Sequence, residues 1–555
     1  MHFNFIKKHP DIFTFIGLFV LFYFIFIFGI GSYALMDIDE TRYASMAHDM
    51  FQSKDFMTLY LNGEYFFEKP PLYFWLECLS FGLFGHVNEF TVRFPVALLG
   101  FLTSFLVYYT GKNVVSRKFG LISALILATS AEFFILSKFA ILDIVLCFCT
   151  TFSIFFGFMT LFCEEKNKKY FWWLFYLFSG LAVLAKGIPG FVLPFGTMFF
   201  AYLTAKKVKE LFKPIYFIVG TLIFLAIVLP WHLLMLHQHD PLFFNEYIMK
   251  HHVARFTTSA DLGRKQPFYF FILTILWGFF PWIIPALVTV KDWGSNCVQL
   301  IREGFDFNKL NNTQKFITLN AIAAVLTLVF FSASSTKLIT YILPIYPFLA
   351  CLTAKVILDI EQTDKWDNFF TNITTLFGII CVLTGIGVFC SKPFLPEELV
   401  QFVEYLYPFS SIFIYFGFVI FLASLIHKYS STEFKNSLFK TTVAVMLVLS
   451  AAGIPIAFNF DYLFGQNDLM EYAKKAKDDN QKLASFGFGR RYSLNYYYGK
   501  HVIYEQFPLY DRLNNLLKDK NTVIVIKNKD YDEYKKHAKF DVIMAGIKYD
   551  LIKGK

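Results

Sequence analysis

The sequence predicts an all-α protein that crosses a membrane many times and ends in a small α/β domain. Of its 555 residues, 56% are hydrophobic and only 17% are charged, a balance that soluble globular proteins of this length do not have. Apolar runs near the length that crosses a bilayer, about 20 residues, recur along most of the chain. Near the C-terminus the sequence becomes polar and alternates between strand-like and helix-like segments.

We expect about thirteen transmembrane helices, one for each long apolar run. The first run is too long for the core of a signal peptide, so we expect it to remain as an anchor. The runs lie near residues 12–33, 91–111, 119–137, 141–163, 170–185, 188–205, 214–236, 268–290, 316–335, 338–358, 369–390, 408–426 and 437–459.

Basic residues in alternate loops predict the orientation of the spans, because Lys and Arg gather on the inner side. The formal net charge of +9 is therefore read as a sign of topology, and nucleic acid is not expected as a partner. An odd number of spans then places the C-terminus outside. The basic loops are Lys7 and Lys8, Arg117 and Lys118, "EEKNKK" (164–169) and "KKVKELFK" (206–213).

The C-terminal stretch predicts helices at "YAKKAKDDNQKL" and "DYDEYKKH" and strands at "NTVIVIKN" and "KFDVIMAG". This alternation is typical of a small α/β domain. We therefore divide the chain into a transmembrane domain at 1–460, with a long outer loop at 34–90, and an outer α/β domain at 461–555.

Charged side chains that are unusual in so apolar a chain fall in the loops of the outer side. One such residue alone is often a solvated helix end, but their joint placement predicts a polar cavity at the outer leaflet. They are Asp39, Arg42, Glu68 and Lys69 in loop 34–90, Asp143 in "KFAILD", Lys186 in "LAKGIPG", His251, His252 and Arg255 in "KHHVARF", and Lys337 in "SSTKLITYILP".

The segment "GEYFFEKPPLYFWL" places Glu68 and Lys69 side by side among aromatic residues. A charged pair in apolar surroundings is costly unless it is paired, solvated or used. The two prolines that follow exclude an ordinary helix through the pair. We expect Pro70 and Pro71 to stop an interfacial helix, so that Lys69 faces a lipid phosphate while the aromatics lie at the membrane interface.

The residue types of the predicted cavity suit a lipid phosphate and a sugar. Cations at a bilayer edge bind phosphate, and carboxylates bind sugar hydroxyls, act as a general base or hold a metal. Glu68 and His252 form a candidate site for Zn²⁺, since carboxylate and imidazole suit this and several other divalent ions.

Four stretches together resemble the 4-amino-4-deoxy-L-arabinose lipid A transferase family. That family belongs to the C-type (GT-C) integral-membrane glycosyltransferases, which include the protein O-mannosyltransferases as distant relatives. The resemblance covers roughly residues 37–350, and "DETRYA" followed by "FEKPPL" is its most specific part. The stretches are "MDIDETRYASMAHDM", "NGEYFFEKPPLYFWL", "NEFTVRFPVALLG" and "STKLITYILPIYPFLA".

The resemblance implies that a sugar moves from an undecaprenyl-phosphate carrier to lipid A, at the periplasmic face of a bacterial inner membrane. It implies catalytic roles for Asp39, Asp143 and Arg42 in the outer loops. Glu68 and His252 match the metal ligands of the family, although the stretch Lys250-His251-His252 is more basic than usual. The residues expected to bind the carrier phosphate are Lys69, Lys186, Arg255, Lys337 and Tyr341.

Two other functions remain open from the sequence. A protein O-glycosyltransferase would use the same kind of donor and modify an envelope protein instead of lipid A. A lipid or sugar transporter is the alternative from another class, but it favours internal repeats and charges buried within spans, and we find neither a repeat nor a cluster of mid-span charges in the sequence.

Overall fold

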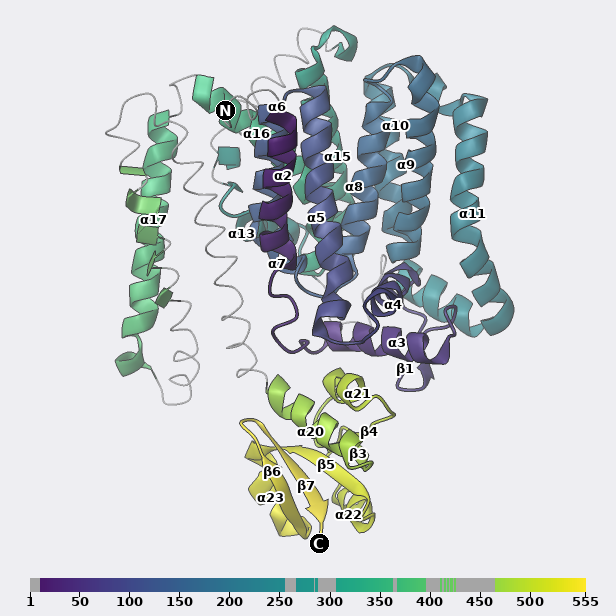
Figure 1. Cartoon of the computed structure of the whole chain (residues 1–555), viewed down its shortest axis with the longest axis vertical. Coiled ribbons are helices and arrows are strands. Elements are labelled where there is room, and N and C mark those ends of the chain that lie inside the picture. The colour runs from purple at the N-terminus through teal and green to yellow at the C-terminus, as the bar shows by residue number, and fades with distance from the viewer. Residues whose placement is uncertain are drawn as a thin grey trace, which may run out of the picture.

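The computed structural model describes residues 10–254, 266–283, 285–287, 306–362, 367–395 and 465–555, together with short pieces between 410 and 425. It has two parts (Figure 1): a bundle of long helices that run in a common direction, and an α/β domain beyond one end of the bundle. The predicted span at 437–459 lies outside the described residues.

The helical bundle follows the apolar runs of the sequence. Capping residues set several helix starts, because a side-chain oxygen of Asn88 or Ser116 accepts a hydrogen bond from a first-turn backbone N–H. The main helices are α2 (Pro10–Phe22), η1 (Tyr23–Ile27), α5 (Glu89–Val114), α6 (Arg117–Thr129), α7 (Ala131–Leu136), α8 (Asp143–Met159), α9 (Glu165–Lys186), α10 (Ile188–Thr204), α11 (Pro214–His239), η3 (Phe244–Ala254), α13 (Phe270–Gly278), α15 (Asn312–Ala333), η5 (Ile339–Ile345), α16 (Tyr346–Gln362) and α17 (Asp367–Cys390).

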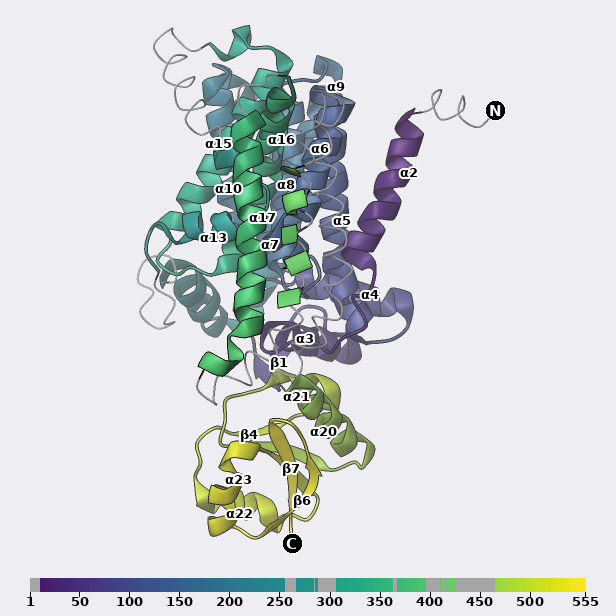
Figure 2. The ribbon, with the colours of Figure 1, turned by 90° about the vertical axis from the view of Figure 1, so that its left-hand side faces the viewer.

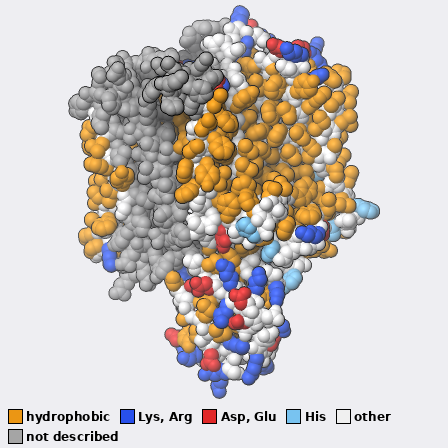
Figure 3. Space-filling model, viewed as in Figure 1, with side chains coloured by type: hydrophobic (Ala, Val, Ile, Leu, Met, Phe, Trp, Pro, Cys, Tyr) orange, Lys and Arg blue, Asp and Glu red, His pale blue; other side chains and the backbone are white. Residues whose placement is uncertain are grey.

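The surface of the bundle is that of a membrane protein. Hydrophobic side chains cover the described flank that Figure 3 shows, and charged side chains gather at the ends of the bundle and on the α/β domain. By length and composition, four described helices can cross a bilayer: Glu89–Val114, Pro214–His239, Asn312–Ala333 and Ile339–Asp359. Other apolar helices are shorter. The expected span at 119–137, for example, is not one continuous helix, because the chain is extended at Ser130 between α6 and α7.

The loop at 34–90 forms two short helices at one end of the bundle (Figure 1): α3 (Asp39–Ser53) and α4 (Leu72–Phe84). Between them β1 (Tyr60–Leu61) and β2 (Glu64–Tyr65) pair as a hairpin. The turn is Asn62-Gly63, with φ of 53° and 82°, and Asn-Gly favours this left-handed conformation.

One prediction about this loop is wrong. Pro70 and Pro71 do not stop a helix; Pro71 is the N-cap of α4, which begins at Leu72. Proline is tolerated at a helix start because the first backbone N–H groups have no partner within the helix. Glu68 and Lys69 therefore lie in the loop that leads into α4.

The C-terminal domain is built on a five-stranded sheet with strand order β4-β3-β5-β7-β6. Strand β3 pairs in parallel with β4 and β5, and β7 pairs antiparallel with β5 and β6. The predicted helices at α20 and α23 and strands at β5 and β6 are confirmed, whereas β3, β4, β7, α21 and α22 were not predicted. The elements are α20 (Gln466–Asp478), β3 (Lys482–Phe486), α21 (Tyr492–Tyr498), β4 (Ile503–Glu505), α22 (Tyr510–Lys518), β5 (Thr522–Lys527), α23 (Tyr531–His537), β6 (Phe540–Ala545) and β7 (Tyr549–Gly554).

Helix α21 of this domain packs against α3, and both views show the domain at the end of the bundle where α3 lies (Figures 1 and 2). The Asp37 carboxylate accepts hydrogen bonds from the Ser493 backbone N–H at 2.9 Å and from its hydroxyl at 2.7 Å. The Tyr497 hydroxyl donates to Glu89 at 3.0 Å. The C-terminal domain and the loop at 34–90 therefore lie at the same end of the bundle.

Candidate functional site

A pocket opens at the α3 end of the bundle, with an empty volume of about 620 Å³ that includes its mouth. Four parts of the chain line it: the loop before α4, the α9–α10 turn, the helix η3, and the stretch from the end of α15 into η5. One wall is apolar and includes Ile188, Pro189, Phe330 and Phe331. The polar side chains that line it include Glu68, Lys69, Lys186, His251 and Tyr341.

An ion pair joins two helix ends at this pocket. Lys186 lies in the last turn of α9, and Asp143 lies in the first turn of α8. Both positions suit their charges, because the helix dipole favours cations at the C-terminus and anions at the N-terminus. The Lys186 ammonium contacts the Asp143 carboxylate and lies 3.9 Å from the ring centroid of Tyr341.

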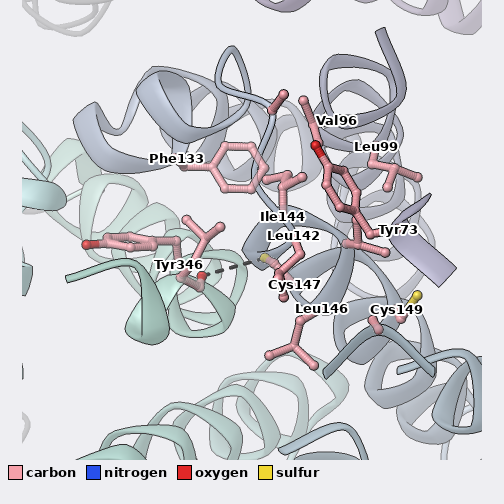
Figure 4. Packing of buried hydrophobic residues seen from close by; sticks show 14 of the residues in the cluster. Tyr73, Val96, Leu99, Phe133, Leu142, Ile144, Leu146, Cys147, Cys149 and Tyr346 are labelled. Carbon is pink, nitrogen blue, oxygen red and sulfur yellow. Dashed lines mark hydrogen bonds between the residues drawn. The ribbon is translucent and has the colours of Figure 1, made fainter. Parts of the chain in front are cut away.

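Local sequence explains this placement. Gly187 ends α9 with a φ of 72°, and α10 starts at once with a proline in its first turn. Lys186 is therefore held at a sharp corner. The start of α8 is fixed by packing instead: Figure 4 shows Leu142, Ile144 and Cys147 within the buried cluster, and the Cys147 thiol donates to the Leu343 carbonyl at 3.6 Å.

The second carboxylate comes from α3. Arg42 Nη2 donates to Asp39 Oδ1 at 2.8 Å and to the Tyr43 hydroxyl at 3.2 Å, while the Asp39 side chain is 61% exposed. Burial lowers the pKa of Arg42, but the charges of Tyr43, Asp39 and Glu68 together raise it above its ordinary value. Glu68 is thus within electrostatic reach of the Asp39–Arg42 pair.

Tyr43 is close enough to both carboxylates to feel their charge, and the sequence analysis did not single it out. Its side chain is buried, and burial is the main reason that its pKa is raised. The charge of Arg42 lowers this pKa, whereas Asp39, Asp143 and Glu68 raise it. The Tyr43 hydroxyl therefore lies near acidic groups from three separate segments. Its position inside "DETRYA", the most specific part of the family resemblance, could have marked Tyr43 as a site residue.

The structure brings together most of the predicted site residues. The exceptions come from the later loops. Lys337 is not among the described residues that line the pocket; its ammonium donates to the carbonyls of Gln266 at 3.2 Å and Ser334 at 2.5 Å, and burial lowers its pKa. Arg255 and the side chain of His252 lie outside what the structure describes. The residues brought together are Asp39, Arg42, Glu68, Lys69, Asp143, Lys186 and Tyr341.

The histidine that lines the pocket with Glu68 is His251, and its Nε2 lies 3.6 Å from Glu246. Within the described residues, no group of three or more His, Cys, Asp and Glu side chains could hold a metal ion. Catalytic zinc sites generally have three protein ligands. The described part of the chain thus supplies a carboxylate and an imidazole, which fit an incomplete site.

Arg93 and Glu40 form a buried ion pair, which the sequence analysis missed. Arg93 lies inside "FTVRFPV", where an apolar run carries a charge. A charge in such a run is itself a signal of function or of a partner, and Arg93 lies near the start of the expected span at 91–111.

Comparison with known proteins gives one family match, to the dolichyl-phosphate-mannose-protein mannosyltransferase family over residues 11–243. A protein of uncharacterised function from Aquifex aeolicus is 30% identical over 375 residues, which are 67% of this chain and 79% of that protein. The undecaprenyl phosphate-alpha-4-amino-4-deoxy-L-arabinose arabinosyl transferase of Pectobacterium atrosepticum is 27% identical over 419 residues, 74% of this chain and 70% of that protein.

Among solved structures, ArnT from Cupriavidus metallidurans bound to undecaprenyl phosphate superposes with a TM-score of 0.79. The two chains are 19% identical, and the match covers 98% of each. At this identity the likeness shows the fold alone, which in the described residues is a helical bundle with a C-terminal α/β domain.

Proposed function

This chain belongs to the GT-C family of integral-membrane glycosyltransferases that use polyprenyl-phosphate sugars, and from that membership we propose that it transfers a sugar from undecaprenyl phosphate to lipid A. The reaction takes place at the periplasmic face of a bacterial inner membrane. In this proposal the transmembrane domain spans 1–460 with about thirteen helices, and the domain at 461–555 is periplasmic.

The observation that supports a lipid-linked donor most strongly is the mixed lining of the pocket. Lys69 and Lys186 lie on the same cavity as Ile188, Phe330 and Phe331. A polyprenyl phosphate has an anionic head directly attached to an apolar chain, so it requires cations and an apolar wall side by side. A water-soluble sugar nucleotide has no apolar chain that would contact this wall.

The transfer needs the leaving phosphate to be stabilised. Lys69 lines the pocket and neutralises the phosphate as the sugar bond breaks. Lys186 lies between the Asp143 carboxylate and the Tyr341 ring and contributes to the same positive field. Arg255 and Lys337 are proposed to reach the phosphate when the donor is bound.

The acceptor oxygen must approach the other side of the sugar carbon. Asp39 is the more exposed of the two carboxylates, which favours it for contact with the acceptor or the donor sugar. A phosphate of lipid A is already ionised at neutral pH and needs no base, so Asp39 would then bind the sugar. Asp143, which is paired with Lys186, orients the sugar from the opposite loop.

A divalent cation, Zn²⁺, is the proposed cofactor, bound by Glu68 and a histidine of the pair His251–His252. It would supply positive charge at the leaving phosphate. The pocket lining supports His251 for this role, whereas the sequence favoured His252.

Protein O-glycosylation is the second candidate, because the family match over residues 11–243 is to protein mannosyltransferases. Membership of a transferase family argues against the transporter alternative.

The deciding experiment incubates the purified protein in proteoliposomes with an undecaprenyl-phosphate sugar, and offers lipid A and periplasmic protein extract together as acceptors. Mass spectrometry of both fractions is expected to show a sugar mass added to lipid A, together with free undecaprenyl phosphate. A sugar mass added to protein but not to lipid A would favour the second candidate. If neither lipid A nor protein gains a sugar, both candidate functions are refuted.

A further inference from the structure

A single buried ion pair connects the two loops that carry Asp39 and Asp143. Arg93 of α5 donates from Nε to Glu40 Oε1 at 2.8 Å and from Nη2 to Glu40 Oε2 at 2.7 Å. The Arg93 and Glu40 side chains are 0% and 2% exposed. A two-pronged contact between a guanidinium and a carboxylate fixes the orientation of both groups, not only their distance.

The remaining donors of Arg93 bind the turn between the first membrane helix and α3. Nη1 donates to the carbonyls of Ile30 at 2.9 Å and Tyr33 at 2.8 Å, and Nη2 donates to the carbonyl of Ala34 at 2.9 Å. All five N–H donors of the guanidinium are therefore used. A lysine has three donors and no planar fork, so it cannot reproduce this arrangement.

Glu40 extends the network to the second loop. Its Oε1 also accepts from the Ala140 backbone N–H at 2.7 Å, and its Oε2 accepts from the Met36 N–H at 2.8 Å. Glu40 directly follows Asp39, and Ala140 lies three residues before Asp143. One carboxylate is thus bonded to both segments that present the candidate catalytic acids.

We propose that Arg93 and Glu40 are positioning residues that set the separation and orientation of Asp39 and Asp143; this inference rests on the proposed transfer reaction. Neighbouring residues on a helix point about 100° apart, so Glu40 can point into the bundle while the exposed Asp39 faces the site. Within the described lining of the pocket, neither Arg93 nor Glu40 takes part. Both act on the reaction only through the two loops.

The test compares Arg93→Lys and Glu40→Gln with the wild type in the donor-dependent transfer assay. We expect kcat to fall about 100-fold, because a displacement near 1 Å is enough for such a loss. The KM for the donor changes little, because Lys69 lines the pocket from the loop before α4, a segment that Glu40 does not bond. Hydrogen exchange gives an independent measurement: in both variants the amides of 36–41 and of 138–143 lose protection together.

Lys168→Met is the matched control. Lys168 is a similarly buried cation, 2.8 Å from Glu165 and 3.1 Å from Glu210, but it lies in the first turn of α9, at the end away from Lys186. We expect this variant to be less stable than the wild type, with unchanged kcat and unchanged exchange at 36–41 and 138–143.

Unchanged kcat, or unchanged exchange at 138–143, in folded Arg93→Lys protein would overturn the proposal. A fall in kcat of the same size in Lys168→Met would also overturn it, because the loss would then reflect stability alone. If the wild type itself transfers no sugar, the proposed function fails. The hydrogen-exchange measurement alone then shows whether Arg93 and Glu40 couple the two loops.

Discussion

Lys186 and Asp143 form an ion pair between the last turn of α9 and the first turn of α8, and their side chains are only 9% and 12% exposed. The pair joins two segments that are far apart in the sequence at the edge of the candidate pocket. It is consistent with the predicted placement of both residues on one side of the membrane.

Breaking this pair from one side should be more harmful than removing both charges. Lys186→Met leaves Asp143 buried without its cation, and such a change costs about 3 to 5 kcal/mol of folding free energy. The double variant Lys186→Met/Asp143→Asn should recover part of that loss. Thermal unfolding in detergent measures the stability of the single and double variants. Strictly additive effects of the two substitutions would contradict the interpretation of the contact as a coupled pair.

Lys69→Ala should abolish sugar transfer while the protein remains folded and inserted. The substitution removes a cation from the pocket, and the residue lies in a loop, so little packing is lost. Size-exclusion chromatography and the transfer assay together measure the two properties. Lys475→Ala is the control, because Lys475 is a surface cation paired with Asp479 on α20. Near-normal turnover by the Lys69 variant would exclude it from phosphate binding.

Asp49 of α3 predicts a pH dependence of stability. Burial raises the pKa of Asp49 from 3.8 to about 6, against an opposing effect of His501. The folded protein therefore favours the protonated carboxyl of Asp49. The stability that this protonation contributes is fully present below pH 4 and is lost as the pH rises through 6.

Asp49→Asn should accordingly be more stable than the wild type at pH 7.5, by about 1 kcal/mol after allowing for solvent screening at this partly exposed site. The difference should vanish near pH 4. Unfolding midpoints of both proteins between pH 4 and pH 8 measure it. A difference that is constant over this range would show that ionisation of Asp49 has no part in it.

Metal retention should depend more on His251 than on its neighbour. His251 lines the pocket with Glu68, so His251→Ala and Glu68→Gln should each lower the zinc content of the purified protein. Elemental analysis after dialysis against trace Zn²⁺ measures the content. Equal zinc in the wild type and both variants would remove these two residues from the metal proposal.

The sequence was informative where a property is local. Apolar runs predicted the helices because the bilayer imposes their length, and the runs at 170–185 and 188–205 placed Lys186 at a helix end. Glu68, Lys69 and Lys186 came together at the pocket, as expected for alternate loops of a polytopic protein that lie on one side. The roles of these residues in catalysis stay predictions.

Other features depend on contacts between distant segments. The Arg93–Glu40 pair joins residues 53 positions apart, and no local pattern indicates that a guanidinium binds three carbonyls. The sequence suggested that a helix ends at Pro70 and Pro71, but Pro71 is the N-cap of α4. Proline is compatible with a helix start and with a position just after a helix end. Strand β7 is the last element of the chain, and its partners β5 and β6 define it only after folding.

The most direct test of the central claim is a structure of the protein with undecaprenyl phosphate bound. We predict that the phosphate lies in the pocket within about 3 Å of the Lys69 ammonium, the distance of a charge-assisted hydrogen bond, with the polyprenyl chain along Ile188 and Phe330. A phosphate bound away from Lys69, or a chain that leaves the pocket on the side of the C-terminal domain, would contradict the account.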